Sequence, residues 1–273
     1  MLGKDDVIVS DALNHASIID GSRLSRATIK VFPHKDVDAA RSIFEALPNS
    51  TRTLLVTDGV FSMDGDVAPL PALCALAEEF GAIMMVDDAH ASGVFGTSGR
   101  GTIDHFGVHG RVHVQVGTLS KALGVLGGYV AGSQTLIDYL IQRARPFLFS
   151  TSHPPAVAAA CLAALDILED EPHRIERLWE NTVYFKTGLR ALGFDTGASE
   201  SPITPVIVGD APRALAFSDR LFDAGVFAQG IGFPTVAHGH ARVRTIVTAT
   251  HTREDLQFAL DAFERVGRAF GLI

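Results

Sequence analysis

The chain of 273 residues carries 31 acidic and 23 basic side chains, a formal net charge of −8, and 47% of its residues are hydrophobic. This length suffices for one large or two modest domains with a buried core. The acidic balance excludes the clustered lysines and arginines that nucleic-acid binding requires. The longest apolar run, Ala156 to Leu165, is too short for a membrane-spanning helix, which needs about 20 residues.

The two cysteines, Cys74 and Cys161, each lie in an apolar, helical-looking run with no second thiol nearby. This usage excludes a disulfide framework or a thiolate metal site and suits a reducing compartment. Acidic residues also stand near the N-terminus, where a signal peptide would carry an apolar segment. We therefore expect a cytoplasmic protein.

Short apolar runs alternate with helical patterns in the first 150 residues. Strands are predicted at residues 7–10, 30–32, 53–56, 82–86, 112–116 and 128–131, and helices at 15–27, 37–47, 69–80 and 136–145. Strands that alternate with helices indicate a mostly parallel sheet covered on both faces, so the predicted fold class is α/β.

The remainder of the chain has a different pattern. A helix predicted at 155–168 runs into the charged stretch EDEPHR at 169–174, which is typical of a domain junction. Beyond it the pattern predicts helices at 175–192, 212–224 and from 252 onward, with strands at 204–208 and 242–247. We therefore expect a large domain over residues 1–170 and a small α+β domain over residues 171–273.

Polar clusters follow four of the predicted strands, where ligands collect in open α/β sheets. They are Asp11–His15, Asp58–Gly65, Asp87–His90 and Gly117–Lys121. Lys121 is either a lysine that reaches solvent from a helix start or a partly desolvated amine suited to Schiff-base chemistry. Asp87 ends a strand expected to be buried, where a carboxylate needs a cation or hydrogen-bond donors. A protonated pyridine nitrogen of a pyridoxal ring would be a natural partner.

Six segments, in this order, resemble the α-oxoamine synthases, which are pyridoxal 5′-phosphate (PLP) enzymes of the aspartate aminotransferase fold class, fold type I. The segments are HASIIDG, DGVFSMDGD, VDDAHASGVFG, GRGT, GTLSKALGVLGGYVAG and RPFLFSTSHPP. The resemblance runs from Asp5 to the C-terminus. It implies a PLP cofactor, amino acid and acyl-CoA substrates, and a homodimer with shared active sites. Family members carry a preceding segment that this sequence lacks, so we expect an N-terminally incomplete large domain.

The resemblance implies a catalytic set of four residues. Lys121 would bond covalently to the cofactor and then act as the base that transfers the substrate proton. Asp87 would pair with the pyridinium nitrogen and His15 would stack on the cofactor ring. His90 would contact the phenolic oxygen of the ring.

Binding roles follow for further residues in the same way. Ser62 would share the contact with the phenolic oxygen, and Thr118 would bind the cofactor phosphate. Ser150 and Thr151 would reach the phosphate of the neighbouring subunit. Arg244, the second arginine of ARVRTIVTATH, would hold the substrate carboxylate, a task that suits the bidentate geometry of a guanidinium group.

The choice of substrates rests on fewer residues. HASIIDG and LGGYVAG favour glycine C-acetyltransferase activity, which joins glycine to acetyl-CoA, and this is the predicted activity. VDDAHASG is equally at home in 8-amino-7-oxononanoate synthases, which use alanine and a pimeloyl thioester and release carbon dioxide. A non-catalytic fragment of such an enzyme is the alternative from another class. His238 and His240 are predicted to lie in a polar loop, because a metal site would need a third ligand, and no metal is expected.

Overall fold

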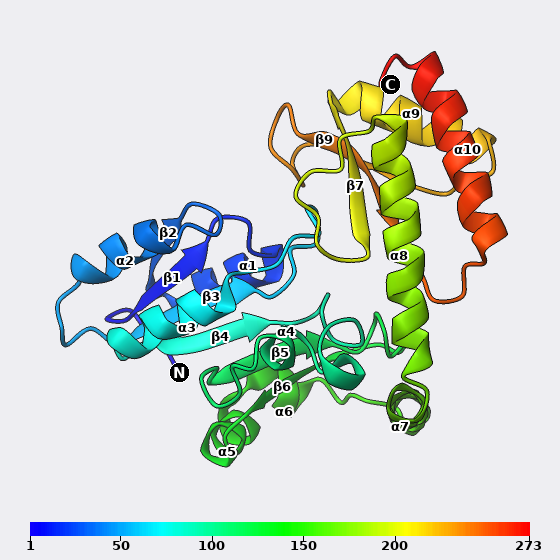
Figure 1. Ribbon diagram of the computed structural model, residues 1–273. Helices are drawn as coiled ribbons and strands as arrows, with labels where there is room; N and C mark the ends of the chain where they lie inside the picture. Colours follow the sequence, from blue (N-terminus) through cyan, green and yellow to red (C-terminus); the bar gives the residue numbers. More distant parts are fainter. The chain divides into compact units, whose positions relative to one another are not determined.

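The computed structural model describes all 273 residues, which divide into two compact units. The N-terminal unit comprises Met1–Phe61 and Ala68–Glu171, and the C-terminal unit comprises Ser62–Val67 and Pro172–Ile273. The boundary predicted from the sequence lies one residue earlier along the chain, and the grouping of residues 62–67 with the C-terminal unit was not predicted. Each unit is built around a sheet of its own (Figure 1).

A six-stranded sheet in the order β2-β1-β3-β4-β5-β6 forms the centre of the N-terminal unit. Its strands are β1 (Val7–Asp11), β2 (Thr28–Phe32), β3 (Thr53–Asp58), β4 (Ile83–Asp87), β5 (Val114–Thr118) and β6 (Gly128–Gly132). The first five are parallel, which confirms the predicted mostly parallel sheet. Strand β6 runs antiparallel to β5, because a loop rather than a crossover helix connects the two.

Helices cover both faces of this sheet. Alternate side chains of a strand point to opposite faces, so Val9 and Leu55 join one core with helices α2 and α3, whereas Ile8 and Val56 join another with α1. The helices of the unit are α1 (Ala16–Ser25), α2 (Val37–Glu45), α3 (Leu70–Glu79), α4 (Thr102–His105), α5 (Gln134–Arg143), α6 (Arg145–Phe149) and α7 (Pro155–Asp170).

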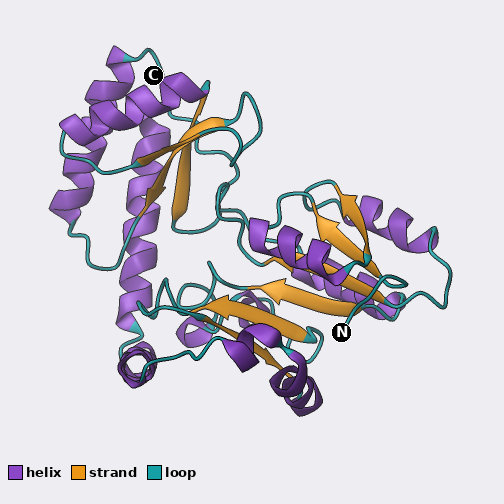
Figure 2. Cartoon of the chain, turned by 180° about the vertical axis from the view of Figure 1, so that it is seen from behind, coloured by secondary structure: helices purple, strands orange, loops and turns teal.

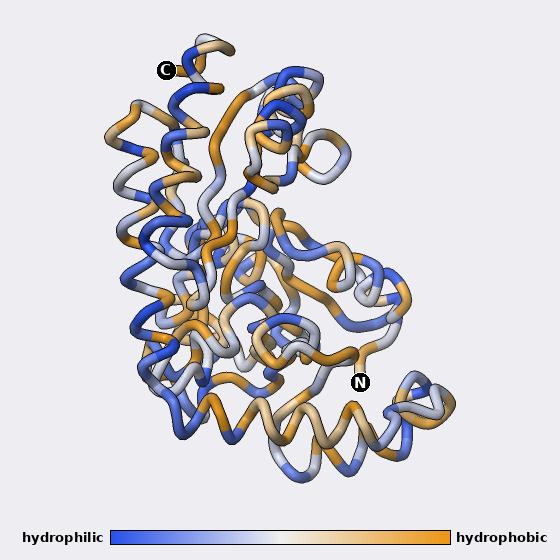
Figure 3. The backbone as a smooth tube through the Cα atoms, turned by 90° about the vertical axis from the view of Figure 1, so that its right-hand side faces the viewer, coloured by the Kyte–Doolittle hydropathy of each residue, from blue (hydrophilic) through white to orange (hydrophobic).

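The C-terminal unit packs three helices on a three-stranded antiparallel sheet (Figure 2). Its strands are β7 (Ile203–Gly209), β8 (Gln229–Ile231) and β9 (Ala241–Ile246), in the order β7-β9-β8, and its helices are α8 (His173–Leu192), α9 (Ala211–Asp223) and α10 (Arg253–Ala269). Apolar and polar positions alternate along these helices (Figure 3). Their apolar faces meet Val206 and Val243 of the sheet in one core.

The predicted elements are confirmed with shifts of a few residues at their ends. The sequence did not predict α4, α6 or β8, which have between three and five residues each. Elements this short cover less than two periods of either a helix or a strand, so they leave no readable hydrophobic pattern. No helix in the structure combines the length and the apolar composition that crossing a membrane requires.

The core of the C-terminal unit generates a stability prediction. The Phe263 ring on α10 is fully buried and packs against Phe185, Phe194 and Phe217 at centroid distances of 6.0, 5.8 and 5.8 Å. We expect Phe263→Ala to lower the free energy of unfolding by about 3–5 kcal/mol, because it leaves a cavity. Denaturant unfolding measures this. Phe258→Ala on the same helix is the control, since Phe258 is 55% exposed, and an equal loss in both variants would contradict the packing described.

Candidate active site

The carboxyl ends of three adjacent parallel strands bring three aspartates to one edge of the N-terminal sheet. Asp11, Asp58 and Asp87 are the last residues of β1, β3 and β4, and they are 2, 6 and 8% exposed. The strand register sets Asp58 directly beside Asp87. Burial and the neighbouring Asp87 carboxylate raise the pKa of Asp58 to about 8, so this carboxyl group is protonated at neutral pH.

Asp58 and Asn14 fix the chain that leads into His15. The amide of His15 donates to Asp58 Oδ2 at 2.8 Å, and the Asp58 amide donates to Asn14 Oδ1 at 2.8 Å. Asn14 also donates from Nδ2 to the carbonyl of Val56 at 2.9 Å. The His15 ring is exposed and caps α1, where its Nδ1 accepts from the Ser17 amide at 3.2 Å. Three buried contacts thus hold the backbone of a residue whose ring remains accessible.

Asp87 and Asp88 are adjacent in sequence but differ in how fully they are hydrogen-bonded. Asp88 accepts from the Thr102 hydroxyl at 2.5 Å, the Thr102 amide at 3.0 Å and Gln115 Nε2 at 3.1 Å, which is a structural role at the start of α4. Asp87 accepts one hydrogen bond, from the Ala89 amide to Oδ1 at 2.9 Å, and its Oδ2 receives none from the chain. A carboxylate oxygen that receives no hydrogen bond from the chain, on a residue that is 8% exposed, is suited to a cationic N–H of a ligand.

Lys121 lies in the loop that connects β5 to β6. The loop closes through the Leu119 amide, which donates to the Gly127 carbonyl at 2.9 Å, and through Thr118 Oγ1, which donates to the same carbonyl at 3.1 Å. Lys121 is exposed, and its positive charge opposes the rise in the pKa of Asp58. The ammonium group is therefore within electrostatic range of the buried carboxyl groups.

His90 and the predicted phosphate-binding residues also belong to the N-terminal unit. His90 is half-buried in the turn that follows β4. Ser150 and Thr151 are exposed just after α6, and the Ser150 hydroxyl lies 2.8 Å from that of Ser152. The ring of the nearby His153 packs against Gly127, where it occupies the space a Cβ atom would need. This contact sets the segment after α6 beside the loop that carries Lys121.

Ser62 and Arg244 meet within the C-terminal unit. Arg244 Nη1 donates to the Ser62 carbonyl at 3.0 Å, while its Nε and Nη2 donate no hydrogen bond to the chain. The guanidinium group is half-buried, and burial, unopposed by any carboxylate, lowers its pKa. An incompletely bonded cation of this kind is suited to an anionic group of a ligand.

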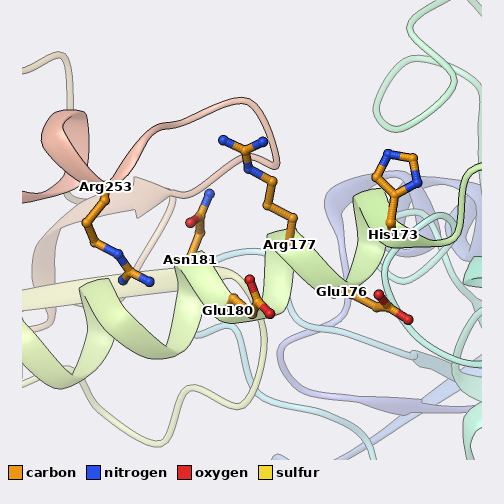
Figure 4. Close-up of a pocket in the computed structure, with 6 residues that line it drawn as sticks. All are labelled: His173, Glu176, Arg177, Glu180, Asn181 and Arg253. Carbon is orange, nitrogen blue, oxygen red and sulfur yellow. The ribbon is translucent and has the colours of Figure 1, made fainter.

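A polar cavity of about 440 Å³ between α8 and the start of α10 contains none of the predicted site residues (Figure 4). It is lined by His173, Glu176, Arg177, Glu180, Asn181 and Arg253. Figure 4 shows five of these side chains along one helix, with acidic and basic groups interspersed. Asn181 donates to the carbonyls of Thr248 and His251, so its amide supports the backbone before α10. Because the acidic and basic side chains of this cavity do not converge on one point, they do not select a ligand of either charge.

Sequence reasoning did not assign site roles to Asp58 and Asn14. Both stand in the polar clusters that follow predicted strands, but an aspartate or asparagine there is also typical of a turn or helix cap. A site residue differs from a turn or cap residue here by the burial of its carboxyl group beside a second one. That burial depends on strand register, which the sequence does not show.

A buried aspartate that ends one parallel strand and a lysine that follows the neighbouring strand are groups that PLP requires, because the amine bonds to the cofactor aldehyde and the carboxylate keeps the ring nitrogen charged. On a mostly parallel sheet joined to a small α+β unit, this arrangement defines the PLP-dependent enzymes of fold type I. The family model described as aminotransferase class I and II matches residues 1–263, and the chain belongs to this family. The predicted resemblance to the α-oxoamine synthases is confirmed.

The relatives that the chain matches are named for one activity in particular. It is 64% identical over 274 residues to an 8-amino-7-oxononanoate synthase of Symbiobacterium thermophilum and 57% identical over 273 residues to 8-amino-7-oxononanoate synthase 1 of Bacillus subtilis. These matches cover all of this chain and 70% of each relative. The chain is thus a PLP-dependent acyltransferase of the α-oxoamine synthase family.

Solved structures agree with this assignment of family and cofactor. A serine palmitoyltransferase from S. paucimobilis, with a bound PLP–myriocin aldimine, superposes with a TM-score of 0.97 at 34% identity, over 100% of this chain and 69% of that one. An 8-amino-7-oxononanoate synthase from Francisella tularensis gives a TM-score of 0.83 at 28% identity, over 98% of this chain and 77% of that one. The predicted PLP cofactor is confirmed.

The protonated state of Asp58 generates a prediction about pH. An unfolded aspartate loses its proton near pH 3.8 and the folded Asp58 near pH 8, so the folded state binds more protons in between. The free energy of unfolding then falls as pH rises through this window. We expect Asp58→Asn, which removes the titration, to be more stable than the parent at pH 8 by about 2 kcal/mol or more, and nearly equal to it at pH 4.

Denaturant unfolding of the chain without added PLP, at several pH values, tests this expectation. Asp20→Asn is the control for the change in net charge, because Asp20 is exposed on α1. A difference between Asp58→Asn and the parent that stays constant from pH 4 to pH 8 would mean that Asp58 is ionised in the folded chain.

Proposed function

We propose that the chain catalyses the condensation of alanine with a pimeloyl thioester, releasing carbon dioxide and the free thiol, which is the reaction of an 8-amino-7-oxononanoate synthase. The observation that carries this proposal is the shared name of the relatives, which match at up to 64% identity over the whole chain. Glycine C-acetyltransferase, the activity predicted from the sequence motifs, is not the name of any relative reported above. The reaction of glycine with acetyl-CoA therefore becomes the alternative outcome of the assay.

The residues of the N-terminal unit fit the cofactor. PLP, when bound, supplies an electron sink that stabilises negative charge on the α-carbon of the amino acid. Asp87, a buried residue with one oxygen that no donor of the chain occupies, would accept the N–H of the ring. Thr118 would hold the phosphate, and Ser150 and Thr151, both exposed, would reach the phosphate of the neighbouring subunit.

The residues around the ring would orient it. The exposed imidazole of His15, on a backbone fixed by Asp58, would stack on one face. His90 and Ser62 would donate to the phenolic oxygen. The raised pKa of Asp58 leaves Asp87 as the carboxyl group that would pair with the ring nitrogen, since burial and the neighbouring Asp87 both favour the protonated form of Asp58.

Lys121 and Arg244 would act on the amino acid itself. Lys121, on an exposed loop, would bond to the cofactor at rest and take the proton from the α-carbon once the substrate amine has replaced it. Arg244 would hold the substrate carboxylate through Nε and Nη2, the two nitrogens that donate no hydrogen bond to the chain.

Replacement of Lys121 tests the cofactor site. We expect the parent chain, mixed with PLP, to show the visible absorbance of a lysine-bonded cofactor, and Lys121→Ala to lack it and to lose activity by about a thousandfold or more. Lys30→Ala, on the exposed side of β2, is the control and should keep both properties. A parent chain without any lysine-dependent absorbance would support a non-catalytic fragment.

Substrate choice is tested by two assays run side by side. With alanine and pimeloyl-CoA we expect release of both free thiol and carbon dioxide, and with glycine and acetyl-CoA turnover at least about tenfold lower. Thiol release measures the rate, and trapped carbon dioxide distinguishes a decarboxylating reaction. Turnover of glycine with acetyl-CoA alone would refute the proposal and support glycine C-acetyltransferase.

A further inference from the structure

The segment Ser62–Val67 is held by the C-terminal unit through contacts that the proposed mechanism does not use. In sequence it lies between β3 and α3, yet it groups with residues 172–273. It begins with Ser62, whose carbonyl accepts from Arg244 Nη1. The contacts of the rest of the segment keep this carbonyl in place.

Arg242 holds the middle of the segment. Its Nη1 donates to the Met63 carbonyl at 2.9 Å and to Asp64 Oδ1 at 2.6 Å, and its Nε donates to the His240 carbonyl at 3.0 Å. The Arg242 side chain is 5% exposed and that of Asp64 34%. A buried arginine that loses its carboxylate becomes an uncompensated charge, so the pair constrains the position of Asp64 strongly.

Lys186 holds the other end of the segment through the loop at Ser199–Ser201. Its Nζ, buried on α8, donates to the Ser199 carbonyl at 3.1 Å, the Ser199 hydroxyl at 3.0 Å and the Ser201 carbonyl at 2.8 Å. Three acceptors and no donor surround this nitrogen, which is the environment of an ammonium group. Burial and Arg190 lower the pKa of Lys186 to about 8, which still leaves it charged at neutral pH.

The loop in turn bonds to the segment. The amides of Glu200 and Ser201 both donate to the Gly65 carbonyl at 3.0 Å, and the Val67 amide donates to Glu200 Oε2 at 3.0 Å. Gly65 has φ +72°, and a Cβ atom there would lie 2.8 Å from the Ser199 hydroxyl. The fit is therefore close enough to require glycine.

The two arginines of β9 differ in one respect. Arg242 and Arg244 are two residues apart and so share one face of the sheet, where they donate to the consecutive carbonyls of Met63 and Ser62. Arg242 is neutralised by Asp64, whereas Arg244 has no carboxylate partner. Arg242 fixes the segment, whereas Arg244 has nitrogens that donate no hydrogen bond to the chain.

We propose that Arg242, Asp64 and Lys186 are positioning residues, which hold Ser62–Val67 so that the Ser62 carbonyl orients the Arg244 guanidinium group toward the carboxylate of the amino acid substrate. This inference rests on the proposed function of Arg244. It assigns no contact with substrate to the three residues. Their effect is on the affinity for the amino acid.

Asp64→Asn is the sharpest test, because it keeps the shape of the side chain and removes its charge. With PLP-loaded chain, the spectral change on adding alanine without thioester gives the affinity for the amino acid. We expect this affinity to fall about 10- to 100-fold, as for a misplaced binding group. The melting temperature should fall, because Arg242 is left as a buried charge without its carboxylate, whereas the affinity for PLP should change little. Lys186→Met should act in the same direction, and Arg268→Gln, which breaks an exposed pair on α10, should change nothing.

Arg244→Lys separates this inference from the function on which it rests. If Arg244→Lys abolishes alanine binding while Asp64→Asn leaves it within twofold of the parent, the positioning role is wrong and the role of Arg244 stands. If Arg244→Lys itself leaves alanine binding unchanged, the proposed function of Arg244 fails. A loss of PLP affinity in Asp64→Asn, in proportion to the loss of alanine affinity, would mean a general structural role and would also overturn the inference.

Discussion

The close approach of Asp58 and Asp87 is the constraint on which the N-terminal unit depends. Parallel register places the ends of β3 and β4 side by side, and burial makes two ionised carboxylates there prohibitively unfavourable. The conflict is resolved by a division of roles. Asp58 keeps its proton and organises the backbone of His15, and Asp87 retains an oxygen for an external cation. Strand geometry and the cost of desolvation thus account for the protonated state of Asp58.

In the C-terminal unit the groups that lie close together are cations. Arg242 and Arg244 stand on one face of β9, and a single carboxylate, Asp64, neutralises one of them. The unit therefore presents a half-buried positive charge whose position is fixed by main-chain carbonyls. The buried acidic and basic side chains discussed above are stable because each of them is protonated, paired with an opposite charge or partly solvated.

Much of the fold and the proposed site could be read from the sequence, because long amphipathic helices and buried strands carry strong periodic signals. The polar clusters after the strands also placed Asp87 at the end of one parallel strand, and His15 and Lys121 a few residues beyond the ends of two others, as the structure has them. The roles of Asp58 and Arg242 could not be read in this way. An aspartate that follows a strand looks the same in the sequence whether it caps a turn or lies beside a second carboxyl group. Only the register of the strands in the folded chain distinguishes the two cases. Likewise, Arg242 pairs with Asp64 at a sequence separation of 178 residues, over which local pattern carries no information.

The segment Ser62–Val67 makes the C-terminal unit discontinuous in sequence. No single cut of the polypeptide yields this unit whole, because a piece that starts at Pro172 would lack Asp64 and the Gly65 carbonyl that Arg242 and the Ser199–Ser201 loop engage. The chain must close a loop of more than a hundred residues before β9 acquires its last partners. Such long-range closure slows folding and couples it to structure formed elsewhere. The folding of the two units is consequently coupled, even though each has a core of its own.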